Sequence, residues 1–251
     1  MLITIVTAVL NGEKYLEHTI RSVLDQDYPY IEYIVIDGGS TDGTIDIIKE
    51  YESRISYWVS EPDGGIADAM NKGIRQSSGN YLLFLHSDDY LVSKSSVRIA
   101  VQKMQLKQDL HSFPIYWERN GHRYLRRSRG FTPWINFKTG FYHQGVFFNR
   151  NIFKRLGEYE TSLRIEMDYE FFLRAYREKS EVFIHHNPPL STMRDTGISS
   201  RRDWGSLVKR FEEEKQIHKK HTNSHLLRYS YAFYWPAYIG YRRYLKILKS
   251  C

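Results

Sequence analysis

Residues 2–37, LITIVTAVLNGEKYLEHTIRSVLDQDYPYIEYIVID, contain two nearly all-apolar runs that flank a segment with helical periodicity. The runs at 2–8 and 31–37 have the length and composition of buried strands. Between them, apolar residues from Leu16 to Leu24 recur at helical spacing, which is typical of an amphipathic helix. A buried strand, a helix and a second buried strand predict the first unit of a parallel α/β sheet.

The same alternation continues to residue 91. We expect, in chain order, a turn at 38–43, a helix to about residue 51, a strand at 55–60, a helix at 66–76 and a strand at 81–86. Four short apolar strands separated by helices predict an open, doubly wound, mostly parallel sheet with helices on both faces. Such sheets bind ligands beyond the carboxyl ends of their strands, and polar residues follow each predicted strand here.

The chain after residue 91 has a mixed pattern of shorter elements. Its strongest signal is Asn120-Gly121, which predicts a hairpin within FPIYWERNGHRYLRR (113–127). The other expected elements are helices at 95–107 and 151–157, a helix that opens at Asp168, strands at 145–149 and 181–187, and a loop at 188–200. We expect them to extend the sheet of one domain, 1–200, which a helical appendage at 201–251 follows.

The cysteine content and the distribution of charge narrow the class of protein. Cys251 is the single cysteine, so an intrachain disulfide and a cysteine-based zinc site are excluded. We expect a cytoplasmic location, since the first residues also lack the features of a signal peptide. The net charge is +7, and residues 201–251 contain 12 Lys and Arg against 4 Asp and Glu, whereas residues 1–200 contain 24 against 25. The basic character therefore belongs to the tail.

The tail interleaves its cations with aromatic residues in HLLRYSYAFYWPAYIGYRRYLKILKSC (225–251). Only 13 uncharged residues separate Arg228 from Arg242, and Pro236 interrupts them, which is too short a run to span a bilayer. A basic helix rich in Tyr and Trp suits an anionic membrane surface, so we expect a peripheral contact at the inner face of the plasma membrane. The alternative is that its apolar residues pack on the core or on a second subunit of an oligomer.

The segment YLLFLHSDDYL (81–91) ends a predicted strand with two adjacent carboxylates, Asp88 and Asp89. Burying an unpaired carboxylate costs on the order of several kcal/mol, so the pair is expected at a strand mouth or on a cation. Magnesium and manganese take one or two carboxylates together with phosphate oxygens of a substrate. Alternatively, the two residues cap the helix near residue 95 or begin a loop.

Three segments carry a resemblance to a known family. They are TAVLNGEKYLEHTIRSVLDQDYPYIEYIVIDGGSTDGT (7–44), SEPDGGIADAMNKGIRQSSGNYLLFLHSDD (60–89) and HQGVFFNRNIFKRLGEYETSLRIEMDYEFFLRA (143–175). In this order and spacing they resemble the successive blocks of family 2 glycosyltransferases, over about residues 2–200. The resemblance implies a GT-A fold, a nucleotide-sugar donor, a divalent metal (Mn²⁺ or Mg²⁺) and inversion at the anomeric carbon. It implies that residues 1–91 bind the nucleotide and 92–200 the acceptor.

The resemblance assigns residues of the first block to the nucleotide base. Thr7, Ala8 and Val9 would line the base pocket, and Asp37 would accept a hydrogen bond from the base. A carboxylate can accept the imide N–H of uracil, which cytosine lacks, so the donor is expected to be UDP-linked. The alternative is that Asp37 forms the turn that follows the second strand.

The second block would supply further donor contacts and the metal ligands. Asp63 and Asp68 would contact nucleotide or sugar, and Lys72 would lie near the diphosphate. The alternative for Lys72 is an ion pair with Asp68, four residues earlier on the same helix. Asp88 would serve the ribose and the metal, and Asp89 the metal. His86 and Ser87 depart from the Asn-Ala that often precedes the two acids in the family.

The third block would supply the general base of an inverting transfer, which removes the proton of the attacking hydroxyl. Asp168 matches the acidic position of the family, although it would also serve as a helix N-cap. Glu166 is the fallback base. His143 matches a position near the acceptor or the diphosphate, although a lone His is often structural. Arg194, in a loop that would close over the donor, is assigned to the diphosphate.

These assignments predict transfer of a hexose or an N-acetylhexosamine to a glycan or to a lipid-diphosphate-linked glycan, as in surface polysaccharide, lipopolysaccharide or O-antigen assembly. A Rossmann oxidoreductase is disfavoured because G-x-G-x-x-G is missing after the first strand. A nucleotidyltransferase would need a Gly-rich basic loop there. The remaining alternative is a non-catalytic protein that binds nucleotides, or nucleic acid through the basic tail. The set of acids favours the enzyme, without a nucleic-acid partner.

Overall fold

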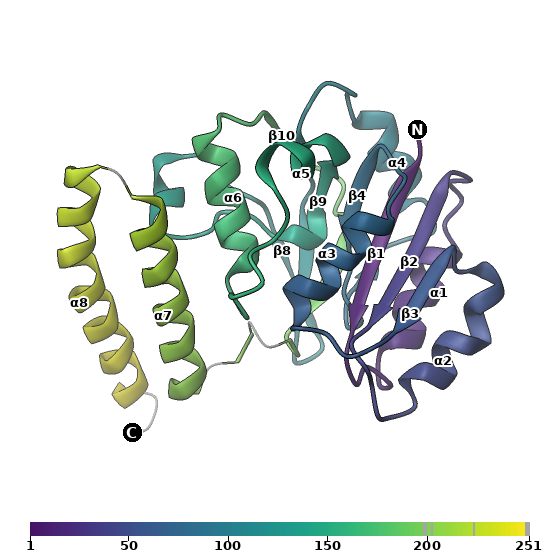
Figure 1. The fold of residues 1–251 in the computed structure, drawn as a ribbon, viewed down its shortest axis with the longest axis horizontal. Coiled ribbons are helices and arrows are strands. Elements are labelled where there is room, and N and C mark those ends of the chain that lie inside the picture. Colours follow the sequence, from purple (N-terminus) through teal and green to yellow (C-terminus); the bar gives the residue numbers. More distant parts are fainter. Residues whose placement is uncertain (198–199, 202, 223, 249–251) are drawn as a thin grey trace. The chain divides into compact units, whose positions relative to one another are not determined.

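The computed structural model describes residues 1–197, 200–201, 203–222 and 224–248 of the chain. The chain divides into two compact units, Met1–Asp203 and Trp204–Cys251. The larger unit contains two β-sheets with their covering helices, and the smaller unit contains two helices (Figure 1).

A seven-stranded sheet in the order β10-β6-β9-β4-β1-β2-β3 forms the centre of the larger unit. Its strands are β1 (Ile3–Val9), β2 (Ile31–Asp37), β3 (Tyr57–Ser60), β4 (Tyr81–Phe84), β6 (Leu110–Ser112), β9 (Val146–Asn149) and β10 (Val182–Ile184). Strands β3, β2, β1 and β4 run parallel, as do β6 and β10, whereas β9 is antiparallel to β4 and β6. The mostly parallel α/β sheet that the apolar strands predicted is therefore confirmed.

Helices cover both faces of this sheet. They are α1 (Leu16–Leu24), α2 (Thr44–Tyr51), α3 (Ile66–Gln76), α4 (Ser96–Lys103), α5 (Arg150–Leu156) and α6 (Met167–Arg177), and a short 3-10 turn, η1 (Glu52–Arg54), follows α2. Because side chains alternate along a strand, Ile3 and Ile5 form one buried cluster with residues of α1, α2 and α4. On the opposite face, Val6 packs so closely on α3 that a Cβ at Gly73 would lie 2.3 Å from its Cγ1.

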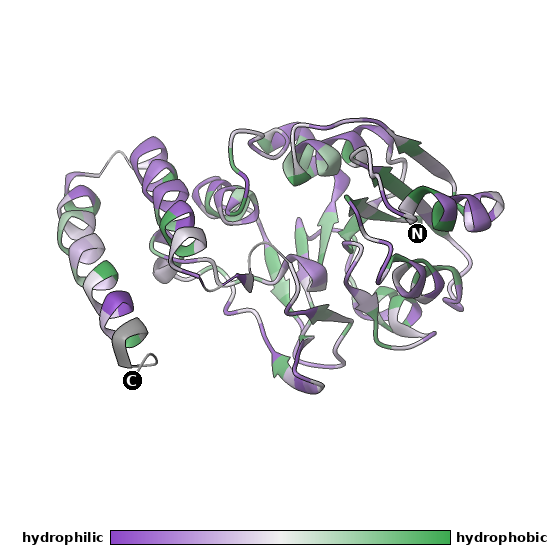
Figure 2. Ribbon diagram, turned by 90° about the horizontal axis from the view of Figure 1, so that it is seen from below, coloured by the Kyte–Doolittle hydropathy of each residue, from purple (hydrophilic) through white to green (hydrophobic). Residues whose placement is uncertain are grey.

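Aromatic rings fill the space between β4, β9, α5 and α6 on that opposite face. The ring centroids of Phe84 and Phe148 are 5.6 Å apart, and those of Phe153 and Phe171 are 5.0 Å apart. Figure 2 shows the strands of the larger unit as mainly hydrophobic, while its helices contain both hydrophilic and hydrophobic residues. This packing fixes α6, whose first turn carries Asp168, against β9 and α5.

A second, four-stranded sheet has the order β5-β11-β7-β8. Its strands are β5 (Tyr90–Leu91), β7 (Ile115–Arg119), β8 (His122–Arg126) and β11 (Ser191–Arg194), and the 3-10 turns η2 (Pro133–Asn136) and η3 (His143–Gly145) precede β9. The predicted hairpin is confirmed, with Asn120 at φ 50° and Gly121 at φ 74° between β7 and β8.

The expectation of a loop over residues 188–200 is wrong in part, because the segment contains a strand. Residues 191–194 form β11, which pairs parallel with β7 and antiparallel with β5. The polar composition of STMR hides a strand because Ser191 and Thr192 are buried within the sheet and make its ladder. Residues 198–199 of the expected lid lie outside the described residues.

The helix expected at 95–107 is shorter, since α4 ends at Lys103. Met104 has an extended backbone with ψ 141°, and the chain then turns back. The hydroxyl of Tyr81 donates to the carbonyl oxygens of Gln105 and Gln108, at 3.2 and 2.7 Å. These tertiary bonds replace the last helical turn.

The smaller unit is a pair of helices, α7 (Trp204–His221) and α8 (His225–Leu248), with Pro236 inside α8. His218 of α7 stacks on Tyr231 with ring centroids 4.1 Å apart, and Trp235 Nε1 donates to His218 Nδ1 over 3.2 Å. Leu226 and Phe233 of α8 are instead more than three-quarters exposed. Figure 2 shows α7 as mostly hydrophilic. Among the helices of the described chain, none has the length and apolar character needed to cross a membrane.

Candidate active site

The carboxyl ends of β1, β2, β3 and β4 lie at one edge of the sheet, where the strand order reverses between β1 and β4. Contacts between the loops show that these ends converge. The backbone N–H of Asn11 donates to Ser40 Oγ over 2.7 Å, and a Cβ at Gly12 would lie 3.1 Å from the Cβ of Ser87. The loops after β1, β2 and β4 therefore meet at this edge.

Asp37 ends β2 and is fully buried. Its Oδ2 accepts hydrogen bonds from the backbone N–H groups of Gly39 and Ser40, at 3.1 and 3.0 Å, and from the Ser60 hydroxyl at 2.6 Å. Its Oδ1 accepts from the Ser40 hydroxyl. The carboxylate thus fixes the turn after β2 and ties it to β3. Contact with a base stays a prediction, which would require Asp37 to share these bonds.

Thr7, Ala8 and Val9 lie at the end of β1, and each is at least nine-tenths buried. The Thr7 hydroxyl donates to the carbonyl oxygen of Leu85 over 2.7 Å and lies 3.1 Å from the Tyr33 hydroxyl. The Thr7 side chain therefore ties β1 to neighbouring strands. That Thr7, Ala8 and Val9 line a base pocket stays a prediction.

Asp63 and Asp68 organise the glycine loop between β3 and α3. Asp63 Oδ1 accepts from the backbone N–H of Gly65 over 2.7 Å, and Asp68 Oδ2 accepts from that of Gly64 over 3.0 Å. A Cβ at Gly38 would lie 2.6 Å from Asp63 Oδ2, so this carboxylate reaches the end of β2. Both acids are partly exposed at the same edge as the other loops.

Lys72 does not form the alternative ion pair with Asp68, and its contact with a diphosphate stays a prediction. Its Nζ lies 2.8 Å from Glu61 Oε1, so its ion pair is with the loop after β3 and not with Asp68. The hydrogen bond to Glu61 also raises the pKa of Lys72. The pair holds the amine on the rim of the glycine loop, from a position nearly two helical turns after the start of α3.

Asp88 and Asp89, the acid pair, follow β4 in a tight turn of residues 86–89, which we call the acid turn. In it the Asp89 N–H donates to the His86 carbonyl oxygen over 3.0 Å. Asp88 Oδ2 accepts from the Thr196 hydroxyl over 2.5 Å and is partly exposed. Asp89 is 1% exposed, and its carboxyl is hydrogen-bonded to Gln144. In the described part of the chain no group reaches its Oδ2.

This orphaned oxygen fits a cation-binding role for the pair. Burial, and then the neighbouring Asp88, raise the pKa of Asp89 well above its usual range. A cation at this turn would relieve the cost of the buried charge. Within residues 1–197 and the other described ranges, no three His, Cys, Asp or Glu gather as a metal site. A cation here would therefore be held by one or two carboxylates and by phosphate oxygens of a ligand.

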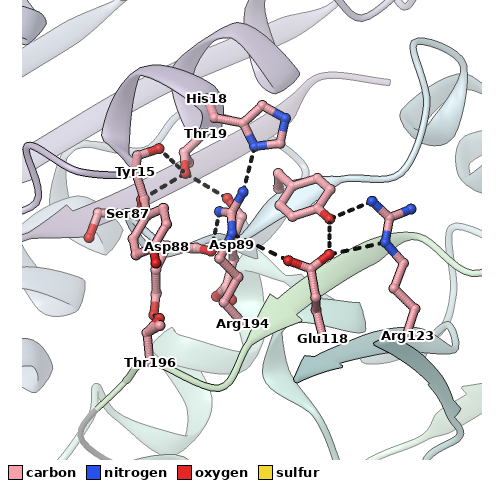
Figure 3. A network of polar contacts seen from close by, with 11 residues as sticks. Tyr15, His18, Thr19, Ser87, Asp88, Asp89, Glu118, Arg123, Arg194 and Thr196 are labelled. Carbon is pink, nitrogen blue, oxygen red and sulfur yellow. Dashed lines mark hydrogen bonds and ion pairs between the residues drawn. The ribbon is translucent and has the colours of Figure 1, made fainter. Parts of the chain in front are cut away.

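Arg194, at the end of β11, holds the acid turn from the second sheet (Figure 3). Its Nη1 donates to the Asp88 carbonyl oxygen over 2.7 Å, its Nη2 to His18 Nδ1 over 2.8 Å, and its Nε lies 3.7 Å from Glu118 Oε1. The guanidinium also lies 4.5 Å from the ring centroid of Tyr90. These contacts tie Arg194 to the Ser87–Asp89 turn, and its expected contact with a diphosphate stays a prediction.

Asp168 lies in the first turn of α6, where its Oδ1 accepts from the N–H of Tyr169 over 2.7 Å. Its Oδ2 lies 3.2 Å from His143 Nδ1, and the side chain is 22% exposed. The ring of His143 in turn contacts that of His86, with centroids 4.8 Å apart. Two imidazoles therefore connect the predicted base with the turn that carries the acid pair.

The antiparallel register of β4 and β9 explains why His143 lies next to His86. Strand β9 pairs with β4 as Leu83↔Phe147, and continuing the pairing brings residues 143–144 opposite 86–87. Glu166, the fallback base, precedes α6 and is only 9% exposed. Asp168 is thus the more accessible of the two acids.

Four residues of the site were not expected from the sequence: His86, Gln144, Tyr159 and Thr196. Tyr159 is 4% exposed, and its pKa is raised well above the usual value by burial and then by the charge of Asp168. Only His86 carried a signal, because it stands where the family often has Asn. The others come from segments whose approach depends on tertiary packing.

Comparison with known proteins identifies the family of the chain. The sequence model described as glycosyl transferase family 2 matches residues 4–181. An uncharacterized glycosyltransferase of Mycobacterium tuberculosis is 33% identical over 227 residues, which cover 87% of this chain and 85% of that relative. The putative teichuronic acid biosynthesis glycosyltransferase TuaG of Bacillus subtilis is 43% identical over 91 residues, 35% of this chain and 36% of TuaG.

Solved structures share the fold. The crystal structure of S. aureus TarS 1-349 in complex with UDP superposes with a TM-score of 0.68 at 18% identity, covering 87% of this chain and 64% of that chain. The complex of the same protein with UDP-GlcNAc gives 0.66 at 17% identity. The present chain thus spans less than two thirds of TarS 1-349 in the UDP complex, and the likeness establishes the shared fold.

Proposed function

The chain belongs to glycosyl transferase family 2, and from this premise we propose that it moves a hexose or N-acetylhexosamine from a UDP-linked donor to a hydroxyl of a glycan. The observation that carries the proposal is the buried Oδ2 of Asp89, which has no hydrogen-bond partner among the described residues and shares one edge of the sheet with Asp168. A cation-binding acid and a separate acid for proton removal are what an inverting transfer needs. A uridine donor is supported by the TarS complexes with UDP and UDP-GlcNAc.

The donor would lie across the ends of β1, β2 and β4. Its nucleotide would sit near the turn fixed by Asp37 and near the glycine loop of Asp63 and Asp68, and its diphosphate at Asp88 and Asp89. These two carboxylates would hold Mn²⁺ or Mg²⁺, which when bound offsets charge on the leaving diphosphate.

Asp168 is proposed as the general base. Its carboxylate accepts hydrogen bonds from Tyr169 and His143 yet is 22% exposed, so it can still reach an incoming hydroxyl. The hydroxyl oxygen would attack the anomeric carbon from the face opposite the diphosphate while Asp168 takes its proton. Glu166 remains the fallback, at 9% exposure.

The acceptor is proposed to be a growing glycan, either free or on a lipid diphosphate. The name of TuaG, which refers to teichuronic acid biosynthesis, supports a polysaccharide acceptor. The basic, aromatic α8 supports delivery at an anionic membrane surface, because Leu226 and Phe233 are exposed beside the tail cations.

A donor panel tests the proposal. Binding of UDP-glucose, UDP-galactose, UDP-GlcNAc and GDP-mannose would be measured by calorimetry with and without Mn²⁺. We expect one UDP-sugar to bind in the presence of Mn²⁺, and Asp89→Asn to abolish the metal-dependent part. Asp46→Asn, in the exposed first turn of α2, is the matched control. If the unaltered chain bound no member of the panel, the proposed function would be rejected.

A further inference from the structure

The contact between His86 and His143 contains polar atoms that the roles proposed above do not use. The two rings have centroids 4.8 Å apart and an interplanar angle of 59°. His86 is 9% exposed, and neither of its ring nitrogens finds a hydrogen-bond partner among the described residues. Nε2 of His143 is buried and equally unpartnered within those residues. Buried polar atoms are nearly always satisfied in folded proteins, so three open nitrogens in one contact point to a ligand.

The hydrogen bond between His143 and Asp168 fixes what His143 can offer. An ionised carboxylate only accepts, so Nδ1 of His143 carries the hydrogen in the 3.2 Å bond to Asp168 Oδ2. A neutral imidazole has one donor and one acceptor nitrogen. Nε2 of neutral His143 is therefore an acceptor, and it is the nitrogen left open.

His86 supplies the complementary group. In its neutral form the ring of His86 has two buried nitrogens that no group of the described chain reaches. It presents one N–H donor and one acceptor lone pair. The two rings together offer a donor and an acceptor without charge. A hydroxyl, which both donates and accepts, matches this pair better than an anion or a cation.

The location of the pair matches the place that the proposed mechanism gives to the transferred sugar. In an in-line displacement the leaving diphosphate and the attacking hydroxyl lie on opposite sides of the anomeric carbon. The sugar ring must then lie between the acid turn and Asp168. His86 immediately precedes the Ser87–Asp89 turn, and His143 is bonded to Asp168. The imidazole pair bridges these two positions.

We propose that His86 and His143 bind one hydroxyl of the donor sugar, which donates to His143 Nε2 and accepts from the N–H of His86. This inference rests on the proposed function and adds a residue that selects the sugar. His86 stands where family members often carry Asn, so the pair would give this chain a donor preference of its own.

His86→Phe isolates the contribution of the ring nitrogens. Phenylalanine keeps an aromatic ring against His143 but removes both nitrogens. The measured quantity is the ratio of the dissociation constant of UDP to that of the UDP-sugar that the unaltered chain binds best in the panel. We expect UDP binding to be unchanged and the ratio to fall roughly tenfold, as for one lost hydrogen bond. His86→Asn, which restores a donor and an acceptor, should recover part of the ratio.

His185→Phe is the matched control, because His185 is also a buried histidine of the large sheet and stacks on Phe113 with centroids 4.0 Å apart. It should leave the ratio unchanged. Thermal stability of His86→Phe should be equal or higher, since the removed nitrogens have no partner within the described chain.

An unchanged ratio in folded His86→Phe would overturn the inference and leave the proposed function intact. Equal weakening of UDP and UDP-sugar in that variant would also overturn it, because it would indicate a structural role only. If His86→Phe did not fold, an unchanged ratio in His86→Asn together with an unchanged order of sugar preference would overturn it. Binding of no nucleotide sugar by the unaltered chain would instead reject the proposed function, and this inference with it.

Discussion

Arg194 donates a hydrogen bond from Nη1 to the carbonyl oxygen of Asp88 over 2.7 Å, from a different sheet and 106 residues away in sequence. On the other side of the turn, the Thr19 hydroxyl donates to the carbonyl oxygens of Ser87 and Asp89, at 2.8 and 2.6 Å. Three consecutive carbonyl groups are thus held by side chains from α1 and β11 (Figure 3). The acid turn is fixed through its backbone, and Asp89 Oδ2 is left without a hydrogen-bond partner among the described residues.

Replacing Arg194 by lysine should weaken cation-dependent nucleotide binding. Lysine keeps the charge but cannot reproduce the planar fork that reaches Asp88 and His18 together. We expect UDP to bind roughly tenfold more weakly in the presence of Mn²⁺, as measured by calorimetry. In the absence of Mn²⁺ the substitution should change UDP binding less. Arg98→Lys, in an exposed ion pair with Asp27, is the control and should bind UDP normally. Equal binding by both variants would remove the positioning role.

Replacing Asp168 by asparagine should separate binding from transfer. The amide keeps the shape of the side chain but cannot take the proton of the acceptor hydroxyl. We expect donor affinity to change less than twofold or so and transfer to fall by roughly a hundredfold or more, the usual scale for a general base. The readout is product formation at saturating donor, with Asp46→Asn as control. Unchanged turnover would exclude Asp168 as the base and direct attention to Glu166.

Replacing Asp37 by alanine should destabilise the fold. The backbone N–H groups of Gly39 and Ser40 and the Ser60 hydroxyl would all lose their acceptor. We expect the free energy of unfolding to fall by roughly 2–4 kcal/mol, because these donors are left at a buried site. Urea denaturation measures this, and Asp37→Asn should lose less. A nucleotide-binding defect without loss of stability would favour the base-binding role instead.

The periodicity of the sequence predicted the central sheet well, because buried parallel strands are short apolar runs whose type does not depend on distant residues. The helix at 66–76 and the strand at 31–37 agree with α3 and β2 in both bounds. Strand β11 was missed because STMR has no apolar alternation and becomes a strand only through its neighbours β5 and β7. Local pattern cannot report such tertiary pairing.

The candidate site shows the same limit. The resemblance placed the acids along the chain, and the fold brings Asp89 and Asp168 to one edge. Which atoms of the site residues are already bonded within the protein depends on side chains from remote segments. Examples are the ion pair of Lys72 with Glu61 and the hydrogen bond of Arg194 to Asp88. The sequence could therefore indicate the chemistry, while the division between ligand-facing and supporting residues required the structure.

The His111–His185 pair should make stability depend on pH. His111 Nε2 lies 2.8 Å from the Gln105 carbonyl oxygen, which only accepts, so Nδ1 of neutral His111 accepts from His185 Nε2 over 3.1 Å. Burial, followed by the charge of His111, lowers the pKa of His185 from 6.5 to about 4. The arrangement therefore requires neutral rings.

The direction of this pH dependence follows from the lowered pKa of His185. Between about pH 6.5 and 4 the unfolded chain binds more protons at His185 than the folded chain, so the free energy of unfolding decreases as the pH falls. The loss across this window is on the order of 3 kcal/mol. Urea denaturation at pH 7.5, 6, 5 and 4 measures it, and His185→Phe should flatten the curve. A variant with the full slope of the unaltered chain would contradict this origin.

The outer face of α8 should bind anionic membranes. Leu226, Tyr229 and Phe233 are 76%, 69% and 78% exposed and recur at helical spacing among the cations of the tail. Such a face lies in the interface plane, with its rings at the headgroup level and its cations near anionic lipids. Serine at these three positions should leave stability within about 0.5 kcal/mol, because exposed side chains contribute little to folding. Flotation with phosphatidylglycerol vesicles should nevertheless fall severalfold, and binding of the unaltered chain should weaken with salt.

Serine at Leu10, Tyr30 and Leu106, which are also exposed, is the control. If the α8 variant floated as well as this control, the membrane role of the tail would be lost, and a face that packs on another protein would replace it.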